Sequence, residues 1–304
     1  MRYRYPDYCK AHALAGESPL PLIGEVPYRG NAYVDIYHGK VGQLPIQLKV
    51  WRGAPMAVEA RADFLLQLMR GLDDWKRASV HQNVSLFLGL SDKPEWQPLP
   101  SLVTPLYSNG NIVQYIKQNP GISVLSLLHN VADALQFMHS LDPPVVHGGV
   151  RGNNIVIADN GEARLTDLCI NFLPHPQDFA MVRDELEPAR WYAPEVIVPP
   201  KELANECNVT TPESDVYSFG MTMLEVYGGK KPYADMRHYS YIHAASQGIR
   251  PPRPDTEALT DSVWALITAC WAQESRHRPQ MKTIRGSIHA LYLQSFANSS
   301  TGHI

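Results

Sequence analysis

The order of apolar patterns along the chain predicts an α+β fold with two lobes, a small β-rich lobe followed by a larger, mainly α-helical one. Four short runs within residues 33–104 have the pattern of β-strands and enclose one long helical segment, whereas apolar residues beyond residue 111 recur mainly at helical spacing. Strands that come first and helices that follow are typical of α+β domains. The chain has 304 residues, 44% of them hydrophobic, which is enough to bury a substantial core.

Composition and charge disfavour several classes of partner. The net charge is −3, the pI is near 6.5 and no long basic run occurs, which argues against nucleic acid or an anionic membrane surface as the principal partner. No stretch approaches the roughly 18 uncharged apolar residues of a membrane span, and the first residues lack the apolar core of a signal peptide. We therefore expect a cytoplasmic or nucleocytoplasmic protein that is not secreted. The cysteines lack metal-ligand spacing, so reduced thiols are expected at Cys9, Cys169, Cys207 and Cys270.

The small lobe is expected over residues 21–107, after an N-terminal extension at 1–20 whose role is not readable. Two strand-like runs, 33–37 and 45–50, flank a Gly-Lys-Val-Gly-Gln turn at residues 39–43 and predict a β-hairpin. The other predicted elements of this lobe are a helix over 56–78 and strands over 85–90 and 99–104.

The larger lobe is expected over residues 108–294. An amphipathic helix is predicted at 124–141. Residues 199–212 are interpreted as a polar insertion, and residues 295–304 as a small polar tail that frays.

The stretch from Val145 to Asp167 carries most of the polar chemistry. Three short apolar runs in it are separated by Gly- and Asn-rich segments, which predicts short strands around a loop with polar side chains. Asn154 follows His147 by seven residues, and Asp167 follows His147 by twenty. A non-enzymatic reading remains open, because Asn and Asp often cap and brace loops without taking part in chemistry.

This spacing resembles the catalytic loop of protein kinases, in which His-Arg-Asp is followed by an Asn seven residues after the His and then by Asp-Phe-Gly. Gly149 stands where the family has the Asp that accepts the proton of the substrate hydroxyl. General-base assistance is worth roughly two to four orders of magnitude in rate. The resemblance therefore implies a degenerate base position, with His147 in a structural role.

The same resemblance implies a nucleotide site. Lys49 is similar to the strand lysine that pairs the phosphates, and Asn154 and Asp167 are similar to the two metal-binding residues. Thr104 resembles the gatekeeper before the hinge, and Tyr107 within the hinge completes the implied cofactor-binding set. An isolated strand lysine is more often a solvated or edge residue, which is the alternative reading of Lys49.

The implied nucleotide site departs from the family at the phosphate loop and the adenine pocket. Arg29, Asn31 and Val34 fall where the family has the three glycines of its phosphate-cradling loop, which lets backbone amides approach the phosphates. Gln47 replaces the small Ala that faces the adenine ring, two positions before Lys49 on the same face of the strand.

Further departures lie in the helix and in the segment after Asp167. The family has a helix Glu that pairs with the strand lysine, but Gly71 or Leu72 occupies that position in this sequence. The remaining candidates for pairing with Lys49 are Glu59, Asp73 and Asp74. Cys169 replaces the final Gly of Asp-Phe-Gly, and Pro188 replaces a Thr that helps to position the catalytic loop. The segment 168–191 contains no Ser, Thr or Tyr, so phosphorylation there is not expected to be a switch.

Structural positions of the family are better matched. Asp215 resembles the Asp of the buried central helix that ties the catalytic-loop backbone in place, and Arg278 is expected to pair with Glu195. The ordered motifs span residues 23–293. They resemble the tyrosine-kinase-like branch, and the His-Gly and Arg-Pro-Pro-Arg-Pro sequences resemble its fungal Ser/Thr members.

The resemblance implies a pseudokinase, a kinase-shaped protein without catalysis that serves as a protein-binding scaffold or allosteric regulator. A protein partner is expected, with an active kinase as one candidate, and no cofactor is required beyond weakly bound ATP and Mg²⁺. Two alternatives stay open. One is a weak or unconventional ATP-dependent kinase or transferase that uses Lys49, Asn154 and Asp167, and the other is a binding module whose cleft is filled by side chains.

Overall fold

A computed structural model describes residues 22–23, 26–30, 34–51, 58–91, 99–168, 187–199, 209–237 and 240–301. These residues fall into two compact units. The first unit holds the described residues up to Val80 together with 85–106, and the second holds 81–84 and the described residues from Tyr107 onward. The division lies next to the lobe boundary predicted between residues 107 and 108, except that Tyr107 and residues 81–84 belong to the second unit. The predicted extension at 1–20 and most of the predicted insertion lie outside the described residues.

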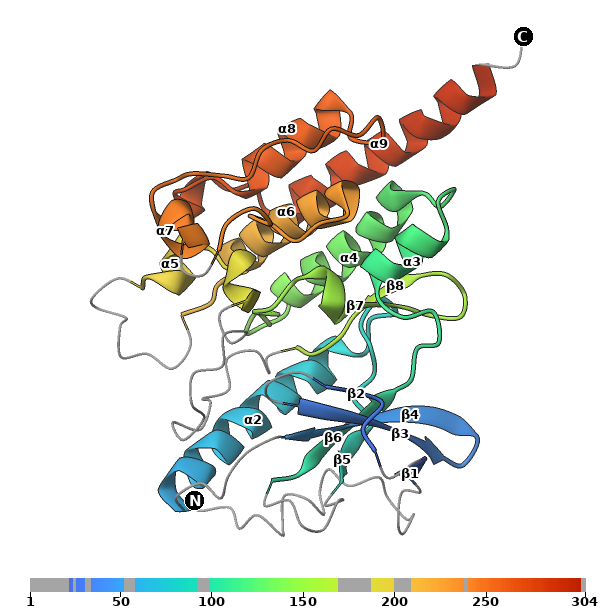
Figure 1. The fold of residues 1–304 in the computed structure, drawn as a ribbon, viewed down its shortest axis with the longest axis vertical. Helices are drawn as coiled ribbons and strands as arrows, with labels where there is room; N and C mark the ends of the chain where they lie inside the picture. Colours follow the sequence, from blue (N-terminus) through green and yellow to red (C-terminus); the bar gives the residue numbers. More distant parts are fainter. Residues whose placement is uncertain are drawn as a thin grey trace. The chain divides into compact units, whose positions relative to one another are not determined.

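The first unit is an antiparallel sheet with one helix (Figure 1). The strand order is β1-β3-β4-β6-β5, with β2 paired to the edge of β3. The strands are β1 (Leu22–Ile23), β2 (Arg29–Gly30), β3 (Val34–Val41), β4 (Leu44–Trp51), β5 (Gly89–Ser91) and β6 (Ser101–Pro105).

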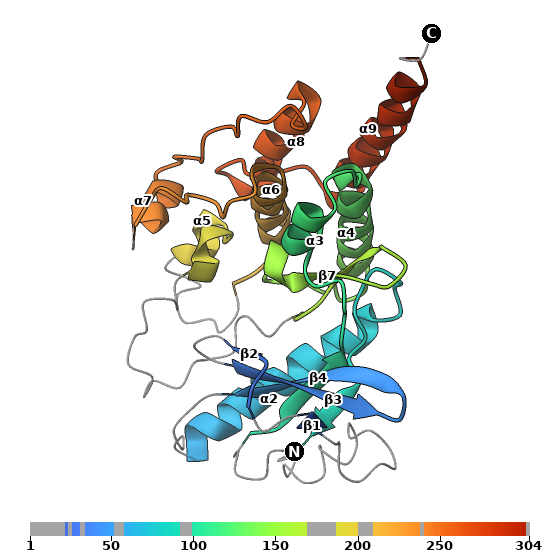
Figure 2. The same ribbon diagram turned by 45° about the vertical axis from the view of Figure 1, so that its right-hand side comes forward.

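The hairpin of β3 and β4 is the longest pairing of this sheet (Figure 2). Val41 pairs with Leu44, so the turn is Gly42 and Gln43, and Gly42 has φ 57°. A two-residue hairpin turn needs such a left-handed position, which glycine adopts without strain. The turn predicted over residues 39–43 contains the observed one but starts too early, because Gly39 lies inside β3 opposite Ile46.

Helix α2 (Val58–Ala78) packs along the sheet of the first unit. Ile46, Leu48 and Val50 alternate along β4 and are fully buried in the core on one face. Trp51 points to the opposite side and contacts Phe64 of α2 edge to face, with ring centroids 5.3 Å apart. The predicted helix over 56–78 is confirmed over its described residues.

The second unit is mainly helical. Its helices are α3 (Ile112–Gln118), α4 (Val124–His139), α5 (Pro194–Ile197), α6 (Pro212–Gly228), α7 (Ser240–Ser246), α8 (Asp261–Cys270) and α9 (Met281–Thr301). It also holds the two-stranded sheet of β7 (Ile155–Ile157) and β8 (Ala163–Leu165), and the 3₁₀ turns η1 (Gly152–Asn154), η2 (Glu187–Arg190) and η4 (Ser275–His277). The predicted two-lobed α+β fold, with a β-rich first lobe and a helical second lobe, is confirmed.

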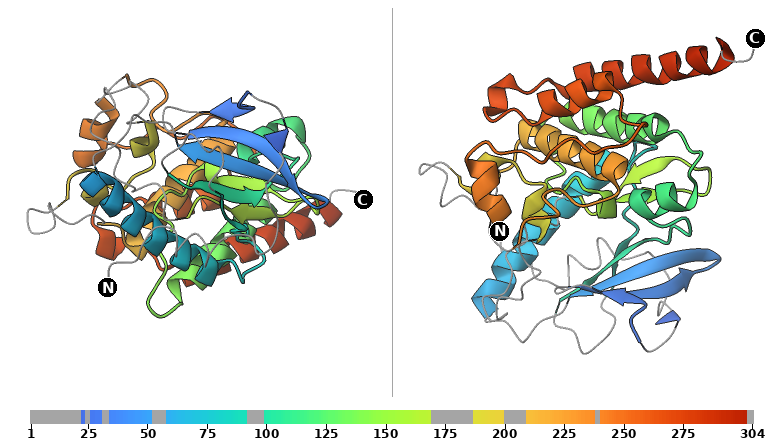
Figure 3. Two further views of the ribbon diagram at one scale, coloured as in Figure 1. Left: turned by 90° about the horizontal axis from the view of Figure 1, so that it is seen from below. Right: turned by 45° about the horizontal axis from the view of Figure 1, so that its top comes forward.

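Helix α6 is the centre of the second unit. All its residues from Ser214 to Val226 are buried, and it contacts α4, α8 and the η1 turn (Figure 3). Thr211 caps its first turn by accepting a hydrogen bond from the Ser214 N–H group at 3.2 Å. Gly229 ends it with φ 63°. Such complete burial makes α6 a fixed frame for the loop described below.

The C-terminal part differs from the sequence prediction. Helix α9 continues to Thr301, so the tail predicted over 295–304 begins too early. The small polar residues there have a composition typical of a frayed chain end. They nevertheless belong to helix α9, which packs against α4. Among the described residues, no helix is both long and apolar enough to cross a membrane.

Candidate functional site

Asp215 of α6 holds the beginning of the loop formed by residues 147–154. Its Oδ2 atom accepts a hydrogen bond from the His147 N–H group at 2.7 Å, and its Oδ1 atom accepts one from Gly148 N–H at 2.8 Å. His139 Nε2 lies 3.0 Å from Oδ2. Gly148 has φ 71°, a conformation that side-chain-bearing residues rarely adopt. The carboxylate thus ties the loop backbone to the central helix, as the resemblance implies for this residue.

His147 links the loop to the strand that precedes Asp167. Its Nδ1 atom accepts a hydrogen bond from Gly149 N–H at 3.1 Å, so the proton resides on Nε2, which donates to the carbonyl of Thr166 at 3.1 Å. The ring is completely buried, and burial lowers the pKa of His147. The imidazole is therefore neutral and acts as a brace.

Gly149 and Asn154 face each other across the loop. The Asn154 side-chain amide donates to the Gly149 carbonyl at 2.9 Å, and the Asn154 carbonyl accepts from Thr166 N–H at 2.9 Å. Gly149 is buried and offers no side chain to accept a proton. Both backbone polar groups of Gly149 are thus engaged in hydrogen bonds within the loop.

Asp167 is fixed by its neighbour rather than by regular structure. The N–H and C=O groups of Thr166 are both engaged, with Asn154 and His147, and Asp167 follows with φ 63°. Asp tolerates this left-handed region better than most residues. Cys169 lies outside the described residues.

Asn154 and Asp167 offer side-chain oxygen atoms, the type of ligand that Mg²⁺ prefers. Among the described residues, no group of three or more His, Cys, Asp or Glu side chains is arranged to hold a metal ion. Mg²⁺ is usually held by one or two protein oxygen ligands, with water and phosphate oxygens completing its octahedron. The side-chain oxygens of Asn154 and Asp167 fit that requirement in kind, so these two residues would hold the ion and it would neutralise phosphate charge.

Glu225 is a site residue that the sequence analysis missed. Its Oε2 atom accepts hydrogen bonds from Gly152 N–H at 2.9 Å and from Trp191 Nε1 at 3.0 Å. Burial raises the pKa of Glu225 to about 7, and the two hydrogen bonds oppose that shift. A Cβ atom on Gly152 would lie 2.4 Å from Val113 Cγ2 and 2.9 Å from Glu225 Oε2. The only sequence signal was a Glu within an otherwise apolar stretch of a buried helix.

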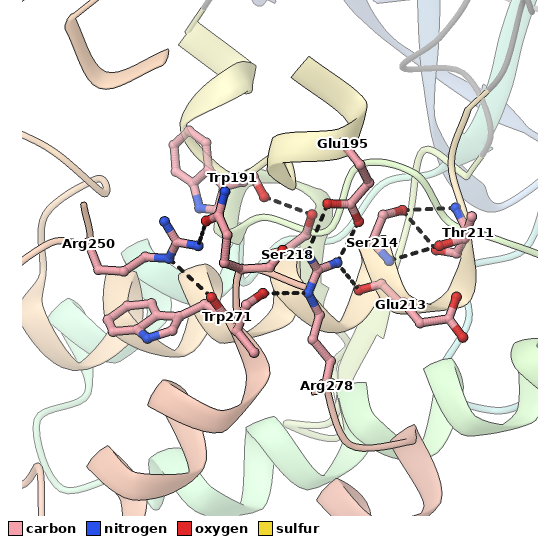
Figure 4. A network of polar contacts seen from close by, with 11 residues as sticks. Trp191, Glu195, Thr211, Glu213, Ser214, Ser218, Arg250, Trp271 and Arg278 are labelled. Carbon is pink, nitrogen blue, oxygen red and sulfur yellow. Dashed lines mark hydrogen bonds and ion pairs between the residues drawn. The ribbon is translucent and has the colours of Figure 1, made fainter. Parts of the chain in front are cut away.

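A polar network next to this contact joins the segment after residue 187 to the helical core (Figure 4). Arg278 Nη1 lies 2.6 Å from Glu195 Oε1, and Arg278 Nη2 lies 2.8 Å from Glu195 Oε2. Arg278 also donates to the carbonyls of Glu213 and Ala272, each at 3.0 Å. The bidentate pair is the one that the resemblance implies, and it is buried on the arginine side.

In the first unit, Lys49 and Gln47 lie on the central strand β4. Lys49 is opposite Ile36 on one side and Leu102 on the other, and it is only 7% exposed. This burial rules out the reading of Lys49 as a solvated edge residue. Gln47 is opposite Thr104 of β6, which places a long polar side chain next to the predicted gatekeeper.

The helix position expected to carry a carboxylate is apolar. Leu72 of α2 is completely buried and Gly71 beside it is buried, whereas Asp74 is partly exposed and pairs with Arg77 at 2.9 Å. Asp73 is exposed, and the side chain of Glu59 lies outside the described residues. The helix position at which the family has a Glu is therefore occupied by a buried residue without a charge.

The phosphate-loop positions are only partly described. Arg29 pairs with Ile36, and Val34 begins β3, while Asn31 lies outside the described residues. Tyr107 belongs to the second unit, where its carbonyl accepts from Gly110 N–H at 3.2 Å.

A cavity of about 550 Å³ lies elsewhere in the second unit. It is bounded by the end of α6, the connection over 230–236 and the segment 250–256. It contains none of the site residues predicted from the sequence. Burial raises the pKa of Tyr227 in its wall to about 12, so this hydroxyl stays protonated.

Comparison with known proteins gives a consistent result. The family model of protein tyrosine and serine/threonine kinases matches residues 33–288. The chain is 25% identical over 292 residues to the human tyrosine-protein kinase Srms, an alignment covering 91% of this chain and 55% of Srms. It is 26% identical over 254 residues to the Arabidopsis thaliana serine/threonine-protein kinase CTR1, covering 79% and 29% respectively. The chain thus spans about half the length of Srms and less than a third of CTR1.

Proposed function

Because the chain belongs to the protein tyrosine and serine/threonine kinase family, we propose that it is a catalytically inactive member that acts as a protein-binding scaffold or allosteric regulator. Weak binding of ATP, or none, is part of this proposal. Fold alone does not determine activity, so the proposal depends on the chemistry of the 147–154 loop.

The observation that carries the proposal is Gly149 within an otherwise complete loop. Asp215, His147 and Asn154 hold the backbone through short hydrogen bonds, so the loop has not lost its shape. Only the carboxylate that would orient and deprotonate a substrate hydroxyl is missing, and a positioned general base typically contributes about 100- to 10,000-fold in rate.

Further departures support weak nucleotide binding. Gln47 lies beside Thr104 on the neighbouring strand, where the resemblance places the adenine pocket. Leu72 is buried at the helix position where the family has the Glu that pairs with the strand lysine. A single restored side chain would leave both of these changes in place.

The second candidate is a weak or unconventional ATP-dependent kinase or transferase. Lys49 favours it, because it is only 7% exposed on the central strand, at the position where the resemblance places the lysine that pairs the nucleotide phosphates. Asn154 and Asp167 supply the two oxygen ligands that the resemblance implies for Mg²⁺. The relatives Srms and CTR1 are named as kinases, one for tyrosine and one for serine and threonine.

Thermal unfolding with and without ATP, each with and without Mg²⁺, separates the two candidates. A ligand at ten times its Kd stabilises the native state by about 1.4 kcal/mol, which shifts the midpoint by a few degrees. We expect no magnesium-dependent shift at millimolar ATP. A clear shift that is lost in Lys49→Ala and Asp167→Ala, but kept in the exposed control Lys40→Ala, would instead support the transferase.

A further inference from the structure

Two histidine rings lie next to each other where helices α4 and α9 of the second unit pack together (Figure 2). His129 belongs to α4 and His289 to α9, and their ring centroids are 5.1 Å apart, with 44° between the ring planes. The His129 Nε2 atom is inaccessible to water and has no hydrogen-bond partner within the part of the chain that the structure describes. A buried polar atom without a partner is costly, so this nitrogen favours a ligand that occupies it.

The distance between the two rings matches the spacing of two imidazoles that bind one metal ion. Zinc lies about 2.1 Å from each ligating nitrogen, and a tetrahedral angle between two such bonds places the ring centroids about 5.2 Å apart. The observed centroid distance agrees with this value. Rings that merely pack also lie about 4.5–7 Å apart, so the unpartnered His129 Nε2 atom is the observation that favours a ligand between them.

The charges around the pair permit a cation. Burial lowers the pKa of His129, Arg285 lowers it further and Asp133 opposes the shift, so the ring is neutral at pH 7 and a nitrogen lone pair is available. The positive charge of Arg285 is itself paired, because its Nε atom lies 2.5 Å from Asp133 Oδ1. The remaining titratable neighbour is His81, whose Nε2 atom lies 3.6 Å from Asp133 Oδ2.

The pair can also be reached by an ion from solution. His289 is exposed, and exposed side chains change rotamer within picoseconds to nanoseconds, so its ring can turn to admit an ion. Among the described residues, no group of three or more His, Cys, Asp or Glu side chains holds a metal. Two imidazoles therefore leave two positions of a tetrahedral ion for water or for a ligand from another molecule.

We propose that His129 and His289 bind a divalent transition-metal ion of the Zn²⁺, Ni²⁺ and Cu²⁺ type, which joins α9 to α4. Imidazole suits these ions, whereas Mg²⁺ prefers oxygen ligands. The site is separate from the oxygen ligands of Asn154 and Asp167, and the inference does not depend on the proposed function.

The test is isothermal titration calorimetry of the full chain, prepared without a histidine tag and freed of metal with EDTA that is then removed. ZnCl₂, NiCl₂ and MgCl₂ are titrated separately at pH 7.5 without nucleotide. We expect saturable binding of one Zn²⁺ or Ni²⁺ ion per chain at this site, and no binding of Mg²⁺ there. Thermal unfolding of the same samples should show a higher midpoint with Zn²⁺, because the ion binds only the folded arrangement of the two helices.

The variants His129→Ala and His289→Ala each remove one ligand. Each is expected to weaken Zn²⁺ and Ni²⁺ binding at least about tenfold, since even loss of a group that only orients a ligand costs about 10- to 100-fold in metal affinity. The control is His243→Ala, a change of an exposed histidine in α7, which should bind as the natural chain does. If circular dichroism shows that His129→Ala does not fold, His129→Gln takes its place, and the exposed His289 still provides a test.

Absence of saturable Zn²⁺ and Ni²⁺ binding by the natural chain would overturn the inference, as would binding that survives unchanged in His289→Ala. An equal loss in His243→Ala would overturn it too, because scattered histidines would then hold the metal. None of these outcomes bears on the proposed function, since nucleotide is absent throughout.

Discussion

The carboxyl group of Glu225 gives the sharpest energetic prediction. It is buried beneath the 147–154 loop, and burial raises its pKa from 4.5 to about 7. Between these two pH values the folded protein keeps the proton on Glu225, and the unfolded chain releases it. A raised carboxyl pKa stabilises the folded state at low pH, and this contribution is lost as pH rises through 7. We therefore expect the natural chain to lose stability, relative to Glu225→Gln, as the pH is raised.

The expected size follows from the two pKa values. The loss approaches about 1.4 kcal/mol per pH unit within the window, and it amounts to about 2 kcal/mol between pH 5.5 and 7.5. Gln is the suitable replacement because its carbonyl oxygen can still accept from Gly152 N–H and Trp191 Nε1.

Urea denaturation of both proteins at several pH values measures this difference. Histidine titrations contribute to both proteins and cancel in the subtraction. Glu213→Gln, a change of an exposed glutamate in the first turn of the same helix, is the control and should give a nearly constant difference. A pH-independent difference between the natural chain and Glu225→Gln would refute the reasoning, because it would mean that the two hydrogen bonds fully compensate the burial of the carboxylate.

Three further predictions concern packing and charge in the second unit. Gly152→Ala should lower the free energy of unfolding in urea by about 1–3 kcal/mol, because its Cβ atom would overlap α3. In the control Gly286→Ala the Cβ atom meets nothing within 4 Å, so this change should be neutral or stabilising. Equal effects of the two substitutions would contradict the packing argument. Arg278→Ala should lower the free energy of unfolding in urea by about 3–5 kcal/mol, because it leaves the Glu195 carboxylate without its partner. A decrease below about 1 kcal/mol would show that the pair behaves as an exposed ion pair. Burial lowers the pKa of His81, so the stability that the neutral imidazole contributes above pH 6.5 should be lost as the pH falls. His81→Gln should therefore flatten the decline of the melting temperature between pH 6.5 and 5. An unchanged decline would show that protonation of His81 does not destabilise the fold.

Residues defined by spacing within one motif were predictable from the sequence. The separation of His147, Asn154 and Asp167 indicated a polar loop, and the structure brings His147 and Asn154 together with the backbone before Asp167. Asp215 was predictable because the sequence from Ser214 to Gly220 resembles the central helix of the family, whose Asp ties the loop backbone in place, and the structure contains those hydrogen bonds.

Residues defined by packing between distant segments were not predictable. Glu225 meets Gly152 and Trp191 only after α6, η1 and the segment after residue 187 come together. Local composition likewise did not locate the hairpin turn within residues 39–43, since Gly39 and Gly42 are equally suited to turns by residue type and only the pairing register distinguishes them.

Several expectations from the resemblance remain predictions. The similarity to fungal kinases and an active kinase as partner come from the family motifs, and the cellular compartment comes from the hydropathy of the sequence. The contacts described above test none of these three. The activation segment that would contain Cys169 lies outside the described residues.

Phosphotransfer from γ-labelled ATP, measured on the natural chain and on Gly149→Asp with Mg²⁺ and a generic protein substrate, tests whether the protein is inactive. We expect no incorporation above background for either protein, because Gly149 offers no base in the first, while Gln47, Leu72 and Pro188 remain unchanged in the second. Magnesium-dependent labelling by the natural chain that is lost in Asp167→Ala would contradict the claim of inactivity. Labelling by Gly149→Asp alone would show that the rest of the site is intact, and would contradict the claim that the defect is distributed.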